Sequence, residues 1–140
     1  MNAVQVAAGI LIRPDQSFLL TQRPDGKVYA GYWEFPGGKV EAKESAADAL
    51  RRELREELNI MIGEPQFWRS YQYRYPHALV DLHFFFVTDW CGEIRGLEGQ
   101  AFAWVAFPEL AVQPLLPANK DILVDLMTAI QTDGMNPSLS

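Results

Sequence analysis

The sequence contains a single cysteine, Cys91, among its 140 residues. One thiol can form neither a disulfide framework nor a cysteine metal cluster within the chain, so we expect a reducing, cytoplasmic setting. No apolar run approaches the roughly 20 residues that a membrane-spanning helix needs. The first residues, MNAVQVAAGILIRP, lack the basic region and the small-residue cleavage site of a signal peptide. These absences argue against disulfide-rich and membrane-associated proteins.

Positive charge is also scarce. The chain has 12 Lys and Arg against 18 Asp and Glu, a formal net charge of −6. Long nucleic acids are bound largely by neutralising their phosphates with a basic surface, so no polymeric nucleic acid partner is expected. A small anionic substrate stays open if metal ions supply the positive charge.

The length and the balance of residues suit one compact domain. Apolar residues make up 49% of the chain and charged residues 21%, which is typical of a globular protein. We place this domain at residues 1–132 and expect residues 133–140 to form a loose polar tail. We expect a monomer or a weak homodimer.

Apolar periodicity predicts a mixed sheet with a few helices, an α/β (α+β) fold. AVQVAAGILIR and SFLLTQR are expected to be paired strands around residues 14–16. FWRSYQYRY and LVDLHFFFVTDW are expected to form a long antiparallel pair around residues 76–77, and AFAWVAF another strand. Helical spacing of apolar residues predicts helices at residues 45–58 and 119–131.

The first predicted helix carries an unusual cluster of acids. Glu53, Glu56 and Glu57 are three and four residues apart, so they share one face that borders the apolar stripe. Like charges placed together repel, and a divalent cation would turn that cost into binding. Mg²⁺ prefers carboxylate and water oxygens and usually bridges to substrate phosphates.

A solvated helix with internal salt bridges is the alternative. Arg52 could pair with Glu56, and Glu53 could pair with Arg51 or Arg52. The preceding segment favours a site, because Gly37-Gly38 allows close backbone approach. In addition, Glu44 is followed by Ser45, a good helix N-cap.

This stretch resembles the Nudix box of the Nudix hydrolases. Residues match that box in type and spacing at Gly38, Glu44, Arg52, Glu53, Leu54, Glu56, Glu57 and Ile60. The one departure is Asn59, where the family has glycine. That position follows the helix and is expected to need a left-handed backbone, which Asn tolerates second best to glycine.

The resemblance implies the Nudix fold, a mixed β-sheet sandwiched between helices, with a loop–helix–loop box. It implies Mg²⁺, with Mn²⁺ as an alternative, and attack of water on a nucleoside diphosphate linkage. Glu53, Glu56 and Glu57 would be metal ligands, assisted by the Gly37 carbonyl. Arg52 would orient a glutamate through a charge-assisted bond, and Glu44 would lie nearby as a support or a candidate base.

Other segments are similar to the MutT type within this family, the 8-oxo-dGTP diphosphatases. WEFPGGKVE is similar to that group's entry to the box, and three further residues match single positions. Glu98 in GLEGQ would complete the metal site, Asn119 in LPANKDIL would read the oxidised base, and Arg23 in TQRP would contact the nucleotide. Each has a plainer interpretation, namely a solvated loop acid, an N-cap of the last helix and an exposed strand-end charge. Their joint agreement with one pattern favours the functional interpretation.

Asn119 suits the chemistry of the oxidised base. 8-Oxoguanine presents O6 as an acceptor and N7–H as a donor, whereas N7 of guanine is an acceptor. An amide that directs its NH₂ at O6 and its C=O at N7–H would accept the first base and repel the second. The backbone at Glu34, Phe35 and Pro36, with the Phe35 ring, is expected to form a second wall.

The sequence thus predicts a Mg²⁺-dependent pyrophosphohydrolase of a small nucleoside triphosphate. The expected reaction converts 8-oxo-dGTP and water to 8-oxo-dGMP and pyrophosphate, which would sanitise the nucleotide pool and prevent mutation. Glu53 is the first candidate for the base, followed by Glu98 and Glu44. A CTP-type or broad-specificity enzyme stays open, because residues 76–78 read Pro-His-Ala where the MutT type is expected to place a charge. A non-catalytic nucleotide-binding module is the remaining alternative, and His83 is expected to be structural.

Overall fold

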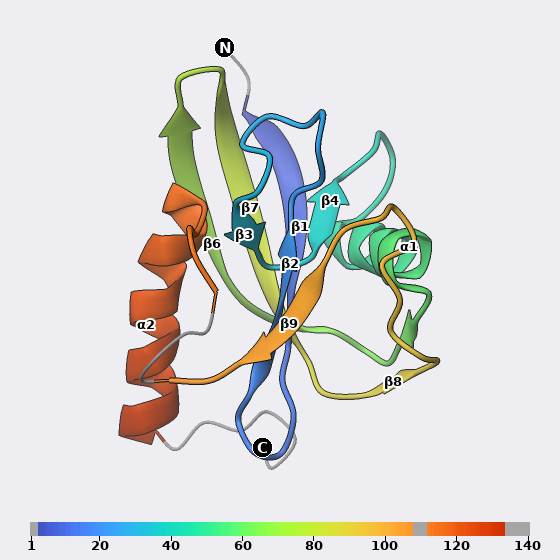
Figure 1. Ribbon diagram of the computed structural model, residues 1–140, viewed down its shortest axis with the longest axis vertical. Helices are drawn as coiled ribbons and strands as arrows, with labels where there is room; N and C mark the ends of the chain where they lie inside the picture. The colour runs from blue at the N-terminus through green and yellow to red at the C-terminus, as the bar shows by residue number, and fades with distance from the viewer. Residues whose placement is uncertain (1–2, 108–111, 134–140) are drawn as a thin grey trace.

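The computed structural model describes residues 3–107 and 112–133. Within these residues the chain forms short and long strands and two helices (Figure 1). In chain order they are β1 (Val4–Leu11), β2 (Phe18–Gln22), β3 (Trp33–Glu34), β4 (Gly37–Lys39), α1 (Ala46–Leu58), β5 (Met61–Ile62), β6 (Gln66–Tyr75), β7 (Ala78–Val87), β8 (Trp90–Cys91), β9 (Phe102–Val105) and α2 (Pro117–Asp133).

A mixed sheet with the strand order β4-β1-β7-β6 is the largest layer. Its central pair, β1 and β7, is parallel, from Val4 opposite Val80 to Leu11 opposite Val87, and its other pairs are antiparallel. A smaller antiparallel sheet has the order β3-β2-β9, and β5 pairs with β8. The predicted antiparallel pair is confirmed as β6 and β7, which turn at residues 76–77.

The predicted pairing of the first two strands is wrong. Between β1 and β2 the structure contains one isolated bridge, from Ile12 to Phe18, and the strands then enter different sheets. Both edges of β1 are occupied, one by β4 and the other by β7. A strand with two partners has no free backbone groups for a third, so β2 pairs with β3 and β9 instead.

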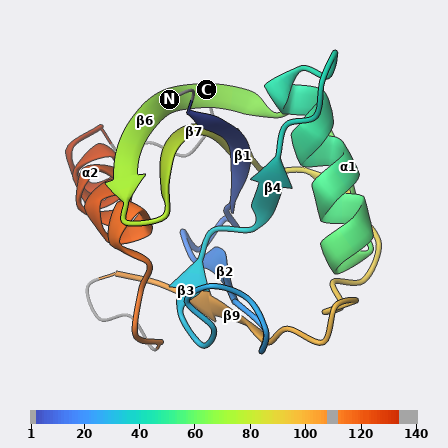
Figure 2. The same cartoon turned by 90° about the horizontal axis from the view of Figure 1, so that it is seen from above.

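The two helices lie on opposite sides of the large sheet (Figure 2). Leu50, Leu54 and Leu58 of α1 belong to a core cluster that contains Leu11 and Phe85. On the other side, residues of α2 such as Ile122 and Leu126 share a core with Phe84 and Phe86. The expected sheet between helices is therefore confirmed, and one helix places its acids beside β4.

Local chemistry fixes both ends of α1. The Ser45 hydroxyl accepts a hydrogen bond from the Asp48 N–H at 3.0 Å, which satisfies an unpaired donor of the first turn. Asn59 has φ 65° and ψ 31°, and its N–H donates to the Arg55 carbonyl. The left-handed backbone predicted at Asn59 is confirmed, so the loss of glycine there leaves the helix end intact.

The second helix differs slightly from its prediction. It begins at Pro117 and reaches Asp133, one residue beyond the predicted end of the domain. The predicted tail lies outside the described residues from 134 onward. Neither described helix is long and apolar enough to cross a membrane.

Candidate active site

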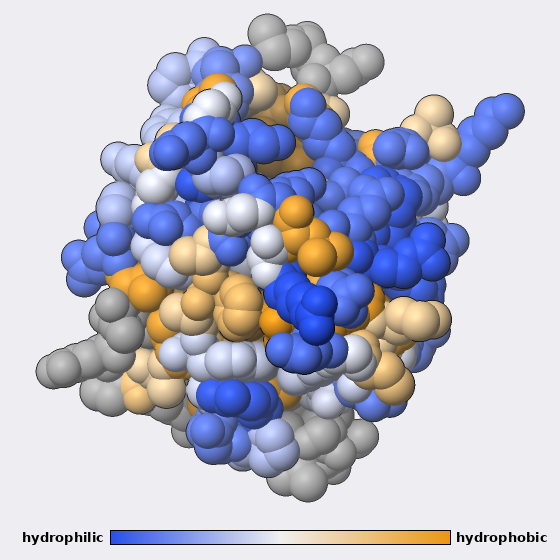
Figure 3. Space-filling model, turned by 45° about the vertical axis from the view of Figure 1, so that its right-hand side comes forward, coloured by the Kyte–Doolittle hydropathy of each residue, from blue (hydrophilic) through white to orange (hydrophobic). Residues whose placement is uncertain are grey.

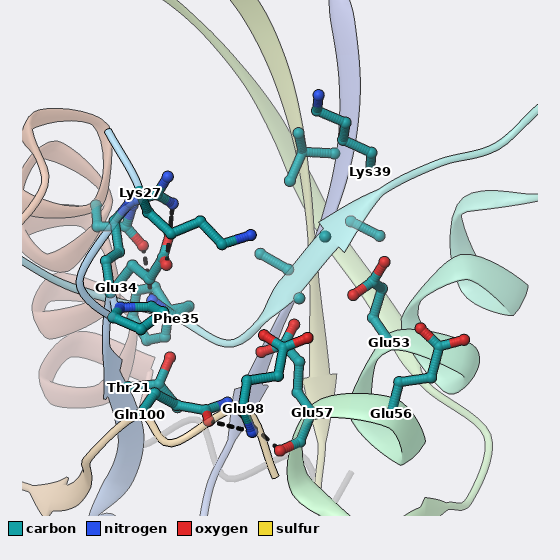
Figure 4. A pocket seen from close by; sticks show the side chains of 18 of the residues that line it. Thr21, Lys27, Glu34, Phe35, Lys39, Glu53, Glu56, Glu57, Glu98 and Gln100 are labelled. Carbon is teal, nitrogen blue, oxygen red and sulfur yellow. Dashed lines mark hydrogen bonds and ion pairs between the residues drawn. The ribbon is translucent and has the colours of Figure 1, made fainter. Parts of the chain in front are cut away.

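A cavity of about 520 Å³ opens where β4, α1 and the loop before β9 meet β2 and β3. Carboxylates stand on one side of it, and Lys27 reaches in from the other (Figure 4). On the outer surface, hydrophilic side chains gather over the side of the molecule formed by α1 (Figure 3). The side chains of this cavity that carry charge are Arg23, Lys27, Glu34, Lys39, Glu41, Glu53, Glu56, Glu57 and Glu98.

The predicted acids come together in this cavity. Glu53, Glu56 and Glu57 extend from α1, and Glu98 approaches Glu57 from the loop (Figure 4). Glu57 is buried, with 9% of its surface exposed, whereas Glu56 is largely exposed. The face that the helical spacing predicted is therefore the wall of a cavity.

Gln100, which the sequence analysis missed, holds Glu98 in place. Its side-chain oxygen accepts the Glu98 N–H at 2.9 Å, and its nitrogen donates to the Glu57 carbonyl at 3.4 Å. The same carbonyl accepts the Leu97 N–H at 2.9 Å. Because Gln100 is itself buried, these bonds attach the loop to the end of α1. Its position two residues after Glu98 was the only signal in the sequence.

The glycine pair makes room for the acids. A Cβ on Gly38 would overlap the Glu53 carboxylate. A Cβ on Gly37 would overlap the Ala7 carbonyl of the neighbouring strand, and its φ of 153° is one that other residues rarely adopt. The predicted close backbone approach is therefore present at both positions, for two different reasons.

Arg52 joins the box loop to the acids. Its guanidinium donates to both oxygens of Glu44, at 2.8 and 2.9 Å, and to Glu53 Oε1 at 2.9 Å. The Arg52 hydrogen bonds hold the pKa of Glu44 well below its usual value, at about 2. Arg52 and Glu44 do not line the cavity, so they lie behind Glu53. The salt bridges proposed as an alternative are also present, but they leave Glu57 and Glu98 without a cationic partner among the described residues.

Burial makes the inner acid difficult to ionise. Burial is the largest cause, and together with the nearby charges of Glu53, Glu34 and Glu98 it raises the pKa of Glu57 to about 9. A divalent cation among these oxygens would stabilise the ionised form, and carboxylate oxygens are the donors that Mg²⁺ selects. Within the described residues, no three acidic, His or Cys side chains already surround one point that could hold a cation. This open arrangement still fits Mg²⁺, which usually takes one or two carboxylates and completes its shell with water and phosphate.

Basic side chains also line the cavity. Lys27 lies across it from the carboxylates of α1, whereas Lys39 extends from β4, the strand beside α1 (Figure 4). Arg23 Nη1 lies 3.2 Å from each oxygen of Glu34, and its Nε donates to the Val28 carbonyl at 2.6 Å. Lys27 and Lys39 form no ion pair with any carboxylate in the described residues, so both remain able to meet an anion. Neither lysine could be predicted from the sequence, because single lysines in a turn and at a strand end carry no pattern.

Asn119 reaches the cavity but does not cap its helix. The helix begins two residues earlier, at Pro117, and Asn119 is buried, with 4% exposed. Its Oδ1 accepts the Phe35 N–H at 2.9 Å. The amide oxygen that the sequence predicts to face the base thus also accepts a backbone N–H, and it retains one lone pair for a ligand.

Two members of the expected second wall are placed differently. The Phe35 ring packs in the core, with centroids 5.8 Å from Phe18 and 5.9 Å from Phe84, so Phe35 offers the cavity mainly its backbone. The Pro36 carbonyl accepts the Gly9 N–H at 2.8 Å, and Pro36 does not line the cavity. Glu34 lines it as expected, in its ion pair with Arg23.

His83 stands apart from this cavity. Its two ring nitrogens lie 2.7 Å from Ser70 Oγ and 2.7 Å from Gln5 Oε1. Both nitrogens are therefore satisfied on the sheet surface, and the structural interpretation of His83 is confirmed.

Comparison with known proteins identifies the family of the chain. The NUDIX domain family matches residues 3–126. The chain is 39% identical over 124 residues to an 8-oxo-dGTP diphosphatase of Haemophilus influenzae, covering 89% of this chain and 91% of the relative. It is 42% identical over 128 residues to a CTP pyrophosphohydrolase of Escherichia coli, covering 91% and 93%. A solved structure from work on MutT of Aliivibrio salmonicida and Vibrio cholerae is 36% identical, with a TM-score of 0.78, and covers 91% of this chain and 98% of that one.

Proposed function

The chain belongs to the NUDIX family of hydrolases, and from this premise we propose that it is a nucleoside triphosphate pyrophosphohydrolase that acts mainly on 8-oxo-dGTP. Its products are 8-oxo-dGMP and pyrophosphate. Removing the oxidised nucleotide from the cytoplasmic pool keeps it out of DNA during replication. No polymeric nucleic acid or membrane takes part, and the working unit is a monomer or a weak homodimer.

One observation carries this proposal. Four carboxylates from α1 and the loop before β9 line the same cavity as the buried amide of Asn119. A triphosphate with its cation fits beside the acids, while the base edge fits beside the amide. If the acids of α1 served only to form salt bridges, neither the burial of Glu57 nor the position of Asn119 would be explained.

The oxygens available to Mg²⁺, or to Mn²⁺, are those of Glu53, Glu56, Glu57 and Glu98, with the Gly37 carbonyl. When bound, the cation neutralises phosphate charge and polarises the phosphoryl oxygens. Phosphoryl transfer needs positioning and charge stabilisation more than covalent chemistry. A cavity lined by these acids and by two lysines without a carboxylate partner among the described residues supplies both.

Glu53 serves as the base in this proposal. It takes a proton from the water whose oxygen attacks the β-phosphorus, and the bridging oxygen leaves with the nucleoside monophosphate. Arg52 donates to Glu53 Oε1 and so fixes the carboxylate, leaving the other oxygen for the water. Glu98 is the second candidate. Glu44 is the weakest, because Arg52 holds both of its oxygens.

Lys27, Lys39 and Arg23 line the cavity and contact the phosphates in this proposal. Lys27 and Lys39 are free to pair with phosphate oxygens, whereas Arg23 is fixed by Glu34 and the Val28 carbonyl. Arg23 therefore acts as a rigid contact, and the lysines act as mobile ones.

Asn119 reads the oxidised base. Because the Phe35 N–H donates to Oδ1, the orientation of the amide is fixed. Its NH₂ can donate to O6, and the remaining lone pair of Oδ1 can accept N7–H. Guanine presents an acceptor at N7, so the same oxygen repels it.

A panel of oxidised and normal triphosphates, followed by pyrophosphate release with Mg²⁺, tests this function. We expect kcat/KM for 8-oxo-dGTP to exceed that for dGTP by several orders of magnitude, roughly 10⁴-fold. Asn119→Ala should reduce this ratio at least about a hundredfold. Without the amide, dGTP no longer places its N7 acceptor against an acceptor oxygen, and 8-oxo-dGTP loses its two hydrogen bonds. Lys120→Ala, on the exposed side of the same helix, is the control. An unchanged ratio in Asn119→Ala would rule out this basis of selectivity.

A CTP-type enzyme is the second candidate. The 42% identity to a CTP pyrophosphohydrolase and the absence of charge at residues 76–78 both favour it. Such an enzyme would give its highest kcat/KM with CTP in the same panel. A non-catalytic module would release no pyrophosphate from any nucleotide, and Glu53→Gln would then change nothing.

A further inference from the structure

A second pocket, of about 300 Å³, adjoins the acidic cavity. The two share Arg23, Glu34 and Asn119 among their linings. They also share Val6, Lys39 and Leu82. The rest of the second pocket is lined by apolar and aromatic side chains, most of them from the β2–β3 loop and the β6–β7 hairpin. A molecule that touches Asn119 from the acidic side therefore extends directly into an apolar space.

Three rings form one wall of this pocket. Tyr75 and His77 stack, with centroids 5.6 Å apart and planes inclined by 28°. Tyr29 packs against both, at 5.6 Å from Tyr75 and 6.1 Å from His77. Tyr75 is buried, and its hydroxyl accepts the Ala118 N–H at 3.2 Å, one residue before Asn119. The stacked pair is thus anchored to the element that carries the base-reading amide.

Tyr29 adopts an unfavourable backbone conformation at its position in this pocket. Its φ is 60°. This left-handed conformation is readily adopted by glycine and asparagine but is costly for a residue with a large side chain. The neighbouring bonds maintain it, since the Tyr32 N–H donates to the Tyr29 carbonyl at 3.1 Å and Arg23 donates to the Val28 carbonyl at 2.6 Å. Local strain of this kind persists where the surroundings over-determine it and is frequent at ligand sites.

We propose that Tyr29 is a substrate-positioning residue on whose ring the nucleobase stacks, with Tyr75 and His77 behind it. This inference rests on the proposed function, since it concerns the same substrate. The phosphates lie beside the carboxylates and the base edge lies beside Asn119, so the plane of the base must lie in the aromatic pocket. Every base has a π-face, and stacking on an aromatic side chain requires no charge. An uncharged residue at position 77 is then compatible with nucleotide binding.

Stacking on the base and hydrogen bonding to its edge contribute differently to substrate recognition. Tyr29 supplies affinity for planar bases in general, with a larger effect for purines because their π-face is larger. Asn119 supplies the distinction between the oxidised and the normal purine. The loss of Tyr29 should therefore weaken binding of both forms while leaving the ratio between them nearly unchanged.

Two substitutions at Tyr29 test the proposal. Tyr29→Phe keeps the ring, and Tyr29→Asn removes it while tolerating the left-handed backbone. We expect Tyr29→Phe to keep KM within about twofold. We expect Tyr29→Asn to raise KM for the best purine triphosphate about tenfold, as loss of one base–aromatic stack predicts, with little change in kcat. Tyr32→Asn is the matched control, because Tyr32 packs on Tyr29 at 5.2 Å but lines neither pocket.

A ligand without a base distinguishes stacking from a structural role. Inorganic tripolyphosphate, used as a competitive inhibitor, should keep its inhibition constant in Tyr29→Asn. The proposal is overturned if KM for nucleotides is unchanged, if the tripolyphosphate constant rises by the same factor, or if Tyr32→Asn has the same effect as Tyr29→Asn. Equilibrium binding of 8-oxo-dGMP separates this inference from the proposed function. Weaker binding to Tyr29→Asn supports the stack even if the wild type releases no pyrophosphate.

Discussion

The position of the Glu53 carboxylate depends on the absence of a side chain at residue 38. A Cβ at Gly38 would occupy the space of this carboxylate, while Arg52 holds one of its oxygens at 2.9 Å. The glutamate is thus confined between a strand backbone and a guanidinium. Catalytic groups held this closely lose activity when they move by about 1 Å.

Gly38→Ala should reduce kcat/KM about a hundredfold. The added methyl group displaces the Glu53 carboxylate, which is the end of a side chain that can move, so the thermal midpoint should change little. Pyrophosphate release and thermal unfolding measure the two effects separately. Gly37→Ala is the contrasting variant, because its methyl group would meet the Ala7 backbone, and it should lower folded yield and stability. Full activity in Gly38→Ala would show that Glu53 needs no such fixed position.

At the scale of the element, local contacts fix both ends of α1 and the loop before it. Ser45 caps its start and Asn59 ends it in a left-handed conformation, while Leu50, Leu54 and Leu58 bury its inner stripe. The box loop before it is tied to it by the pair of Glu44 and Arg52. Loop and helix thus form one local structure that presents its acids on a single face.

Acid should weaken this unit through Glu44. Its pKa is about 2 in the folded protein against a usual 4.5, because Arg52 donates to its carboxylate. A depressed pKa contributes stability that is fully present above pH 4.5 and is lost as the pH falls through about 2. The free energy of unfolding of Glu44→Gln should therefore lie below that of the wild type at pH 7, and the gap should narrow between pH 4.5 and 2.

Urea unfolding at several pH values measures this gap. Glu93→Gln, which alters an exposed loop acid, is the control. A gap between Glu44→Gln and the wild type that stays constant down to pH 2 would mean that the pair with Arg52 contributes nothing through ionisation.

At the scale of the whole molecule, the fold divides charge across one cavity. The chain carries a net charge of −6, yet Arg23, Lys27 and Lys39 line the same cavity as the acids. The proposed substrate, a nucleotide with its cation, would be complementary to both kinds of charge.

Mg²⁺ should stabilise the folded protein. A ligand that binds only the native state at 100 times its Kd adds about 2.7 kcal/mol, and here it also relieves repulsion among Glu53, Glu57 and Glu98. We expect the thermal midpoint to rise with MgCl₂ and to rise less in the double variant Glu53→Gln/Glu57→Gln. KCl at equal ionic strength is the control, and an equal rise with KCl would indicate general screening in place of a site.

The sequence by itself determined what is local along the chain. Helical spacing placed Glu53, Glu56 and Glu57 on one face, and residue type at 45 and 59 set the ends of α1. The β6–β7 hairpin followed in the same way, because its strands are neighbours in sequence.

Only the tertiary structure decided which distant segments meet. Asn119 reaches Phe35 across 84 residues, Gln100 reaches Glu57 across 43, and β1 leaves β2 for β4 and β7. A strand pattern specifies which side chains are buried, but it does not specify which backbone edge each partner takes. Contacts of this range form only when the sheets assemble. The acids of the site and Arg23 could therefore be predicted from the chain, while Lys27, Lys39, Gln100 and the aromatic pocket could not.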